Sequence, residues 1–240
     1  MSNARLVEVL DRVEKTAAEG VLPILVFDLD STLFQTEARN LRILHEFAEQ
    51  HGGDFEGLRE QVAGLTLSDM GWNVHSSLME RGLDAPDMIA ALKKFWFERF
   101  FTDAYVAFDQ PTAGSVDFVN RCHQLGGFIY YLTGRNVGGM EHGTVQALTD
   151  AGFPYWRGRT SLHLKPDFTT HDKVFKDVAL GDIRSHFGRV VATFENEPGN
   201  ANLFHDAFEG GLHFLLETIH STEAEEPYAE LIRISDFVTD

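Results

Sequence analysis

The sequence predicts an α/β protein built on a parallel sheet with helices on both faces, and with a helical segment inserted after the first strand. Two patterns carry this prediction. Short apolar runs typical of fully buried strands alternate with amphipathic segments of helical length over most of the chain. Residues 36–108 differ, because they have helical character throughout and no convincing strand interrupts them.

The first elements can be read in order from the N-terminus. Residues 4–19 place apolar residues at helical spacing and are followed by Gly20, which predicts an amphipathic helix that stops there. Residues 22–27 form an unbroken apolar run, the pattern of a strand buried on both faces. The helical insert follows, and its ends are expected near Gln35 and Asp109.

The alternation of strands and helices resumes after the insert. We predict helices at residues 111–126, 143–153 and 170–188, and strands at residues 127–135, 160–166 and 211–218 and within residues 189–200. No element is assigned to residues 201–210, and the tail at residues 221–240 is expected to form an edge element.

The composition limits the possible partners. Lys and Arg number 20 and Asp and Glu number 37, which gives a formal charge of −17. A surface this acidic repels nucleic acid, so a phosphate ligand requires a metal ion or a placed Lys or Arg. No stretch has the length of a membrane span, the N-terminus lacks a signal-peptide pattern, and the only cysteine is Cys122. We therefore expect a soluble cytoplasmic protein.

Residues with reactive or hydrogen-bonding side chains gather where strands end. They follow three predicted strands: Asp28, Asp30 and Thr32; Thr133, Gly134 and Arg135; and Glu195, Asn196 and Glu197. Ligands of open parallel sheets bind outside the carboxyl ends of the strands, so these groups are expected to meet. Acids from two strand ends, a hydroxyl from a third and a nearby lysine describe a metal-assisted phosphoryl-transfer site.

The spacing of the two aspartates suits two different tasks. Asp28, at the strand terminus, can attack phosphorus and form an aspartyl-phosphate. Residues two apart in an extended segment project to the same side, so Asp30 can lie beside Asp28. Asp30 can then protonate the leaving alkoxide and later deprotonate the water that hydrolyses the intermediate.

The same residues offer ligands for Mg²⁺, which prefers oxygen atoms and keeps several waters. Asp28, the backbone carbonyl of Asp30 and Glu195 are the expected ligands, with Asn196 or Glu197 completing the shell.

The phosphate group needs its own contacts. Thr133 and the amide of Gly134 are expected to bind phosphate oxygens, and Thr32 and Arg135 are further candidates. A lysine would supply positive charge during transfer, and Lys176 is the preferred candidate.

These motifs resemble those of the haloacid dehalogenase (HAD) superfamily of phosphohydrolases. The first motif is "VFDLDST", and the second is the strand "FIYYLTGR" with Thr133 near its end. The resemblance covers residues 20–35 and 109–220. It implies a three-layer Rossmann-like core at residues 1–35 and 109–240, with a helical C1 cap at residues 36–108. It also implies a Mg²⁺-dependent phosphatase that acts on a small phosphorylated metabolite through an aspartyl-phosphate.

The third and fourth motifs depart from the family pattern. The fourth reads "FENEPGN", where the family has an Asp pair or an Asp followed by a later Asp, so Glu195 would take the metal position. The third motif has three candidates, Lys165, Lys173 and Lys176. We favour Lys176, which lies 19 residues before Glu195, a spacing that fits one helix and one strand.

Other functions remain open on the sequence alone. A phosphomutase or other phosphotransferase would use the same residues with a second acceptor, and a catalytically decayed binding protein would explain the unusual fourth motif. Dehalogenation is disfavoured, because a halide leaves without a proton and needs no acid at Asp30. The aromatic run "KKFWFERFF" at residues 93–101 is expected in the cap core and at the cap–core boundary. The substrate and the oligomeric state are not predicted.

Overall fold

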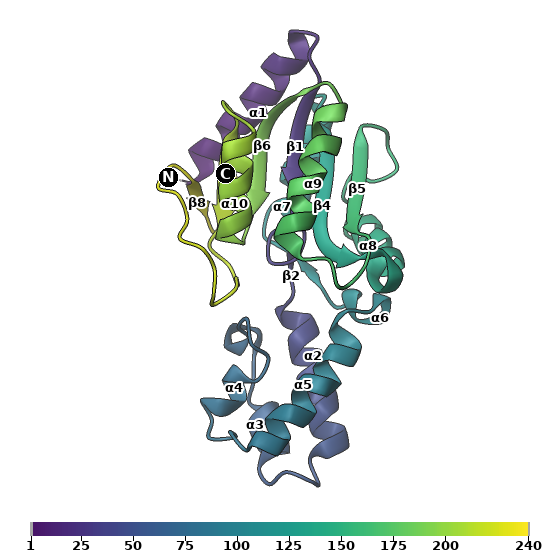
Figure 1. Cartoon of the computed structure of the whole chain (residues 1–240), viewed down its shortest axis with the longest axis vertical. Coiled ribbons are helices and arrows are strands. Elements are labelled where there is room, and N and C mark those ends of the chain that lie inside the picture. Colours follow the sequence, from purple (N-terminus) through teal and green to yellow (C-terminus); the bar gives the residue numbers. More distant parts are fainter. Residues whose placement is uncertain (1, 240) are drawn as a thin grey trace.

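The computed structural model describes residues 2–239 and contains a six-stranded parallel sheet (Figure 1). The strand order is β5-β4-β1-β6-β7-β8, with every neighbouring pair parallel. The strands are β1 Pro23–Phe27, β4 Phe128–Asn136, β5 Thr160–Lys165, β6 Arg189–Glu195, β7 Leu212–Leu216 and β8 Ile232–Ile234. The predicted α/β class with a parallel sheet is confirmed, and the C-terminal tail supplies the edge strand β8.

Helices cover both faces of this sheet. They are α1 Ser2–Ala18, α7 Ser115–Gln124, α8 Val137–Ala151, α9 Asp172–Ser185 and α10 Pro198–Ala207. The side chains of β1 alternate between two apolar clusters, as the period of a strand requires. Leu25 and Phe27 pack with α1 and α7, whereas Ile24 and Val26 pack with α9 and α10. Figure 1 shows α9 and α10 together in front of the sheet.

Two helical segments differ from the sequence prediction. Helix α10 was missed altogether, although Pro198 occupies its first turn, a favoured position for proline. Helix α8 begins at Val137 rather than at residue 143. Its first turns contain glycines, which weaken a helical pattern, but Gly143 is needed for packing. A Cβ atom there would lie 2.6 Å from the backbone oxygen of Asp103.

The inserted segment forms a helical layer beyond the carboxyl edge of the sheet (Figure 1). Its helices are α2 Glu37–His51, α3 Leu58–Ala63, α4 Ser76–Met79, α5 Pro86–Phe100 and α6 Asp103–Val106, with a 3-10 turn at Leu67–Asp69. It has its own apolar core, in which α2 packs against α3 and α5. The predicted helical insertion after the first strand is therefore confirmed.

The chain enters and leaves the insert at one place. β2 Phe34–Gln35 pairs antiparallel with β3 Gln110–Pro111. This ladder lies beside the expected domain boundaries, and the division into residues 36–108 and the rest stays our proposal. Among the residues that the structure describes, no helix has the length and apolar character needed to cross a membrane.

Candidate active site

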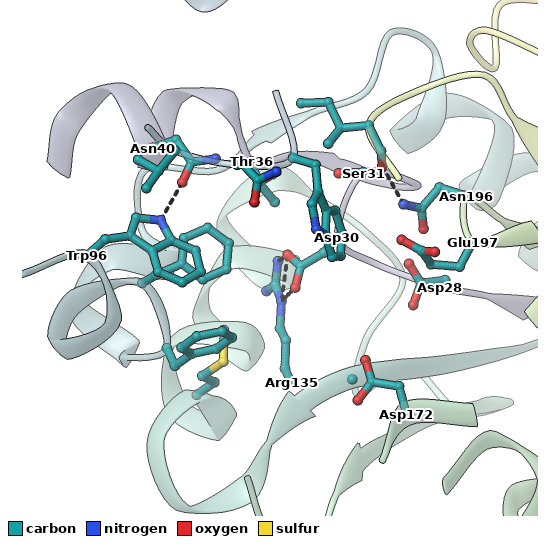
Figure 2. Close-up of a pocket in the computed structure, with 18 of the residues that line it drawn as sticks. Asp28, Asp30, Ser31, Thr36, Asn40, Trp96, Arg135, Asp172, Asn196 and Glu197 are labelled. Carbon is teal, nitrogen blue, oxygen red and sulfur yellow. Dashed lines mark hydrogen bonds and ion pairs between the residues drawn. The ribbon is translucent and has the colours of Figure 1, made fainter. Parts of the chain in front are cut away.

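A cavity of about 600 Å³ lies where the carboxyl ends of β1, β4 and β6 face the insert. The ends of the strands and the loops that follow them contribute the charged side chains Asp28, Asp30, Arg135, Lys165, Glu195 and Glu197 to its lining. The insert contributes five large aromatic side chains together with several polar ones, and the aromatic ones are Trp72, Trp96, Phe97, Phe100 and Phe101. Figure 2 shows Asp28, Asp30, Arg135 and Glu197 on the charged side and Trp96 on the aromatic side.

The loop after β1 fixes the first motif. The amide of Asp28 donates a hydrogen bond of 3.0 Å to the carbonyl of Phe194, which ties Asp28 to the neighbouring strand β6. Ser31 has a φ of 56°, in the left-handed region that residues other than glycine seldom adopt. The backbone therefore turns sharply directly after Asp30, and such strained turns occur often at functional sites.

Lys176 joins the first and fourth motifs. Its Nζ atom lies 2.8 Å from Oδ1 of Asp28 and 2.6 Å from Oε2 of Glu195, and all three side chains are buried. Burial and the neighbouring Glu195 raise the pKa of Asp28 to about 7. Burial opposes a charge on Lys176, but the two carboxylates outweigh it and raise the lysine pKa above its usual value. Two acids thus share one cation, which leaves excess negative charge at the site.

The three candidate lysines have different places. Lys176, on α9, lies between the two acids. Lys165, at the end of β5, lines the cavity but is paired with Asp172 at 2.6 Å. Lys173 does not line the cavity and pairs with Glu225. Of the three, Lys176 is the one that contacts both Asp28 and Glu195.

Asp30 is held by two arginines. Its Oδ1 lies 2.7 Å from Nη2 of Arg135 and 3.0 Å from Nη2 of Arg39, and both arginine side chains are fully buried. Asp109 binds the same two arginines, which makes a cluster of four charged side chains. Burial alone would raise the pKa of Asp30, but the arginines lower it to about 2. Figure 2 shows Asp30 bonded to Arg135, the contact that favours its ionised form.

This cluster changes the interpretation of Arg135. We expected its guanidinium to contact phosphate, whereas it is bonded to Asp30 and Asp109. Arg39 and Asp109 were not predicted as site residues. Arg39 lies near the start of the insert and Asp109 follows its end, so the two meet only when the insert is folded. The local sequence around either residue does not indicate this contact.

The residues predicted to contact phosphate divide into those that line the cavity and those that do not. Gly134 lines the cavity. The side chains of Thr32 and Thr133 are fully buried, and neither residue is among those that line it. Thr133 Oγ1 accepts a hydrogen bond of 3.2 Å from the amide of Arg135. Thr32 donates one of 3.3 Å to Oδ1 of Asn196.

The oxygen donors fit a hard divalent cation chemically. The donors near Asp28 are carboxylates, and Glu197 is close enough to Asp28 that their charges affect each other. In the described part of the chain, however, no three His, Cys, Asp or Glu side chains converge closely enough to form a metal site. Lys176 lies between Asp28 and Glu195 and bonds to both, so the two carboxylates are directed at the lysine and not at a common cation position.

Asn196 and Glu197 differ as possible ligands. The amide of Asn196 is engaged at both ends, because its Nδ2 also donates to the carbonyl of Ile219 at 2.7 Å. Glu197 uses one oxygen to accept the amide of Ser221 at 2.8 Å, which leaves the other for a cation. Glu197 is therefore the better placed of the two.

Asn200 was overlooked in the sequence. It lies in the first turn of α10, is buried and lines the cavity. The signal was available, since the fourth motif of the resembled family can place its second polar residue later in the chain. Because residues 198–207 do not have an obvious helical pattern in the sequence, the position of Asn200 in the first turn of a helix is seen only in the structure.

Comparisons with known proteins agree with this architecture. No protein-family model and no curated protein matches the sequence. Solved structures that resemble it include a haloacid dehalogenase-like hydrolase from Bacteroides fragilis (16% identity, TM-score 0.53, covering 90% of this chain and 97% of that one). A HAD-superfamily hydrolase of subfamily IA from Geobacter sulfurreducens shares 13% identity with a TM-score of 0.51 over 90% and 93% of the two chains. Protein Tyrosine Kinase A from Mycobacterium tuberculosis shares 14% identity with a TM-score of 0.54 over 90% and 94%.

These identities are low, so the likeness concerns the fold, and a fold alone does not determine a reaction. Two of the three structural neighbours described above are HAD-like hydrolases, and each of them covers 90% of this chain. The protein therefore has the haloacid dehalogenase fold, with a Rossmann-like parallel core and a helical cap inserted after its first strand.

Proposed function

We propose that the protein is a Mg²⁺-dependent phosphatase that hydrolyses a small phosphorylated metabolite through an aspartyl-phosphate. The observation that carries the proposal is the buried contact of Lys176 with both Asp28 and Glu195 at the carboxyl edge of the sheet. An acid at a strand end, a shared cation and an adjoining cavity together provide a nucleophile and a place for its substrate.

Asp28 is the proposed nucleophile. Its raised pKa reflects burial and an excess of acids over cations around it. Asp28, the carbonyl of Asp30, Glu195 and Glu197 would hold the Mg²⁺ ion. When bound, Mg²⁺ would offset the charge of these acids and of the arriving phosphate. Lys176 would remain beside Asp28 and balance the charge of the phosphoryl group as it transfers.

Asp30 is the proposed proton carrier. Arg39 and Arg135 hold it ionised, and once these contacts weaken it would accept a proton from the water that cleaves the aspartyl-phosphate. Protonation of the leaving alkoxide in the first step requires Asp30 to carry a proton, so its arginine contacts must loosen before that step.

The same fold occurs in a protein named as a tyrosine kinase, so transfer to a second acceptor is the main rival reaction. Steady release of inorganic phosphate with water as the only acceptor would distinguish hydrolysis from transfer. A binding protein without activity is the second rival.

The test is phosphate release from a panel of phosphomonoesters with and without Mg²⁺. We expect Mg²⁺-dependent turnover that Asp28→Asn lowers by at least about a hundredfold. Asp177→Asn is the matched control, because Asp177 follows Lys176 on α9 but is exposed and does not line the cavity. If no ester in the panel releases phosphate and calorimetry detects no Mg²⁺ binding, the binding protein is the correct interpretation.

A further inference from the structure

Three large aromatic side chains that line the cavity remain substantially exposed to solvent. Trp72 is 49% exposed, Phe97 51% and Phe168 42%, and all three line the cavity. Large apolar side chains exposed together beside a polar centre are typical of a ligand-binding wall. These three residues with Phe101 are called the aromatic wall below.

The aromatic wall is made by both parts of the molecule. Phe97 lies on α5 and Phe101 directly follows it, whereas Phe168 lies in the core loop between β5 and α9. The ring of Phe168 is 5.2 Å from that of Phe97 and 4.8 Å from that of Phe101, in edge-to-face geometry. The rings support one another, so this part of the wall is formed before a ligand arrives.

The aromatic wall itself offers no side-chain hydrogen-bonding group other than the indole of Trp72. Asn40 lines the cavity, and its Oδ1 already accepts a hydrogen bond of 2.7 Å from Nε1 of Trp96 (Figure 2). The other polar lining residues from the insert are Thr36, Asn73, His75 and Lys93. A hydroxyl-rich leaving group, such as a sugar, would bury several donors and acceptors against rings that cannot bond them.

We propose, on the basis of the proposed function, that the substrate is a phosphomonoester whose alcohol carries a planar aromatic group. Its phosphate lies beside Asp28 and Lys176, and its ring lies against the aromatic wall. The cavity volume of about 600 Å³ accommodates a substrate with one or two rings. The reaction stays the hydrolysis of a P–O bond: water supplies the oxygen of inorganic phosphate and the alcohol leaves with a proton.

The test compares benzyl phosphate with glycerol 3-phosphate in Mg²⁺ buffer. Both release primary alkoxides, so the chemical step is similar and the difference reports on the wall. We expect kcat/KM to be at least about tenfold higher for benzyl phosphate, which corresponds to about 1.4 kcal/mol of transition-state binding. Glucose 6-phosphate, with more hydroxyls, should be a poor substrate.

Variants locate the preference. Phe97→Ala and Trp72→Ala should each reduce the benzyl-to-glycerol ratio at least about threefold, mainly through KM. Phe187→Ala is the control, because Phe187 is 94% exposed and does not line the cavity. A binding readout accompanies the kinetics: benzylphosphonate should bind more tightly than methylphosphonate by calorimetry, and Phe97→Ala should remove most of that difference.

The outcomes separate the two proposals. Equal or faster turnover of glycerol 3-phosphate or glucose 6-phosphate overturns the aromatic-substrate inference and leaves the phosphatase proposal intact. An unchanged ratio in both wall variants also overturns it. Absence of phosphate release from every ester overturns the phosphatase proposal and this inference with it.

Discussion

Replacing Arg39 with methionine is expected to lower the free energy of unfolding by about 3 kcal/mol. Arg39 lies on α2 with no solvent exposure of its side chain. Its Nε is 2.8 Å from Oδ1 of Asp109, its Nη2 is 3.0 Å from Oδ1 of Asp30, and its Nη1 is 3.1 Å from the carbonyl of Phe100. Methionine keeps most of the apolar stem, so the loss is mainly electrostatic.

The magnitude follows from what the substitution leaves behind. Breaking a buried ion pair on one side costs about 3–5 kcal/mol, because the remaining charge has no partner. Asp109 is also fully buried, but Arg135 still contacts it and Asp30. The remaining arginine limits the damage, so the lower end of that range applies.

Urea unfolding followed by both circular dichroism and tryptophan fluorescence measures this effect. With an m-value of about 3 kcal/mol/M, the midpoint should fall by about 1 M. Arg42→Met is the matched control on the same helix. Arg42 is half-exposed, pairs with Glu46 and lies 5.5 Å from the ring centroid of Phe108, so its loss should change stability by less than about 1 kcal/mol. Equal effects of the two substitutions would refute the reasoning about the buried cluster.

Three further predictions concern other parts of the molecule. Burial lowers the pKa of His213 to about 4, against about 6.5 when unfolded, so stability should fall as pH drops from about 6.5 to about 4. His213→Gln should flatten that part of a melting-temperature profile. Gly143→Ala should destabilise the protein by about 1–3 kcal/mol in thermal melts, because the new Cβ would clash with the backbone of Asp103. Gly181→Ala in α9 is the control: its Cβ would have open space around it, so it should stabilise the protein by about 0.5–1 kcal/mol. Lys176→Met leaves two buried acids without their cation, so phosphate release should be lost, and its melting temperature should recover towards wild type at lower pH.

The sequence predicted the fold well because buried parallel strands have an unmistakable pattern. Residues 23–27 are apolar on both faces, and the structure buries all five. Helices with glycine or proline in their first turns were harder, since α8 was predicted to begin too late and α10 was missed. Propensity predicted breaks at these positions, whereas tertiary packing stabilises helices there.

The candidate site was predictable where it depends on strand ends. The carboxyl ends of parallel strands lie at one edge of a sheet, which predicted that Asp28 and Glu195 would gather there. The observed order, with β1 between β4 and β6, brings the two acids together. The four-charge cluster was not predictable, because Arg39 and Asp109 are 70 residues apart and meet through packing of the insert. Local sequence carries no information about such a contact.

The short ladder of β2 and β3 has a consequence for how such molecules diversify. Gln35 lies opposite Gln110, so the chain returns to the point from which it departed. An insert anchored in this way can be lengthened, shortened or replaced without moving either of its ends. A longer insert costs little extra entropy of loop closure. The insert that covers the acids can therefore change in size and shape between related proteins, while the carboxyl edge of the sheet keeps its geometry.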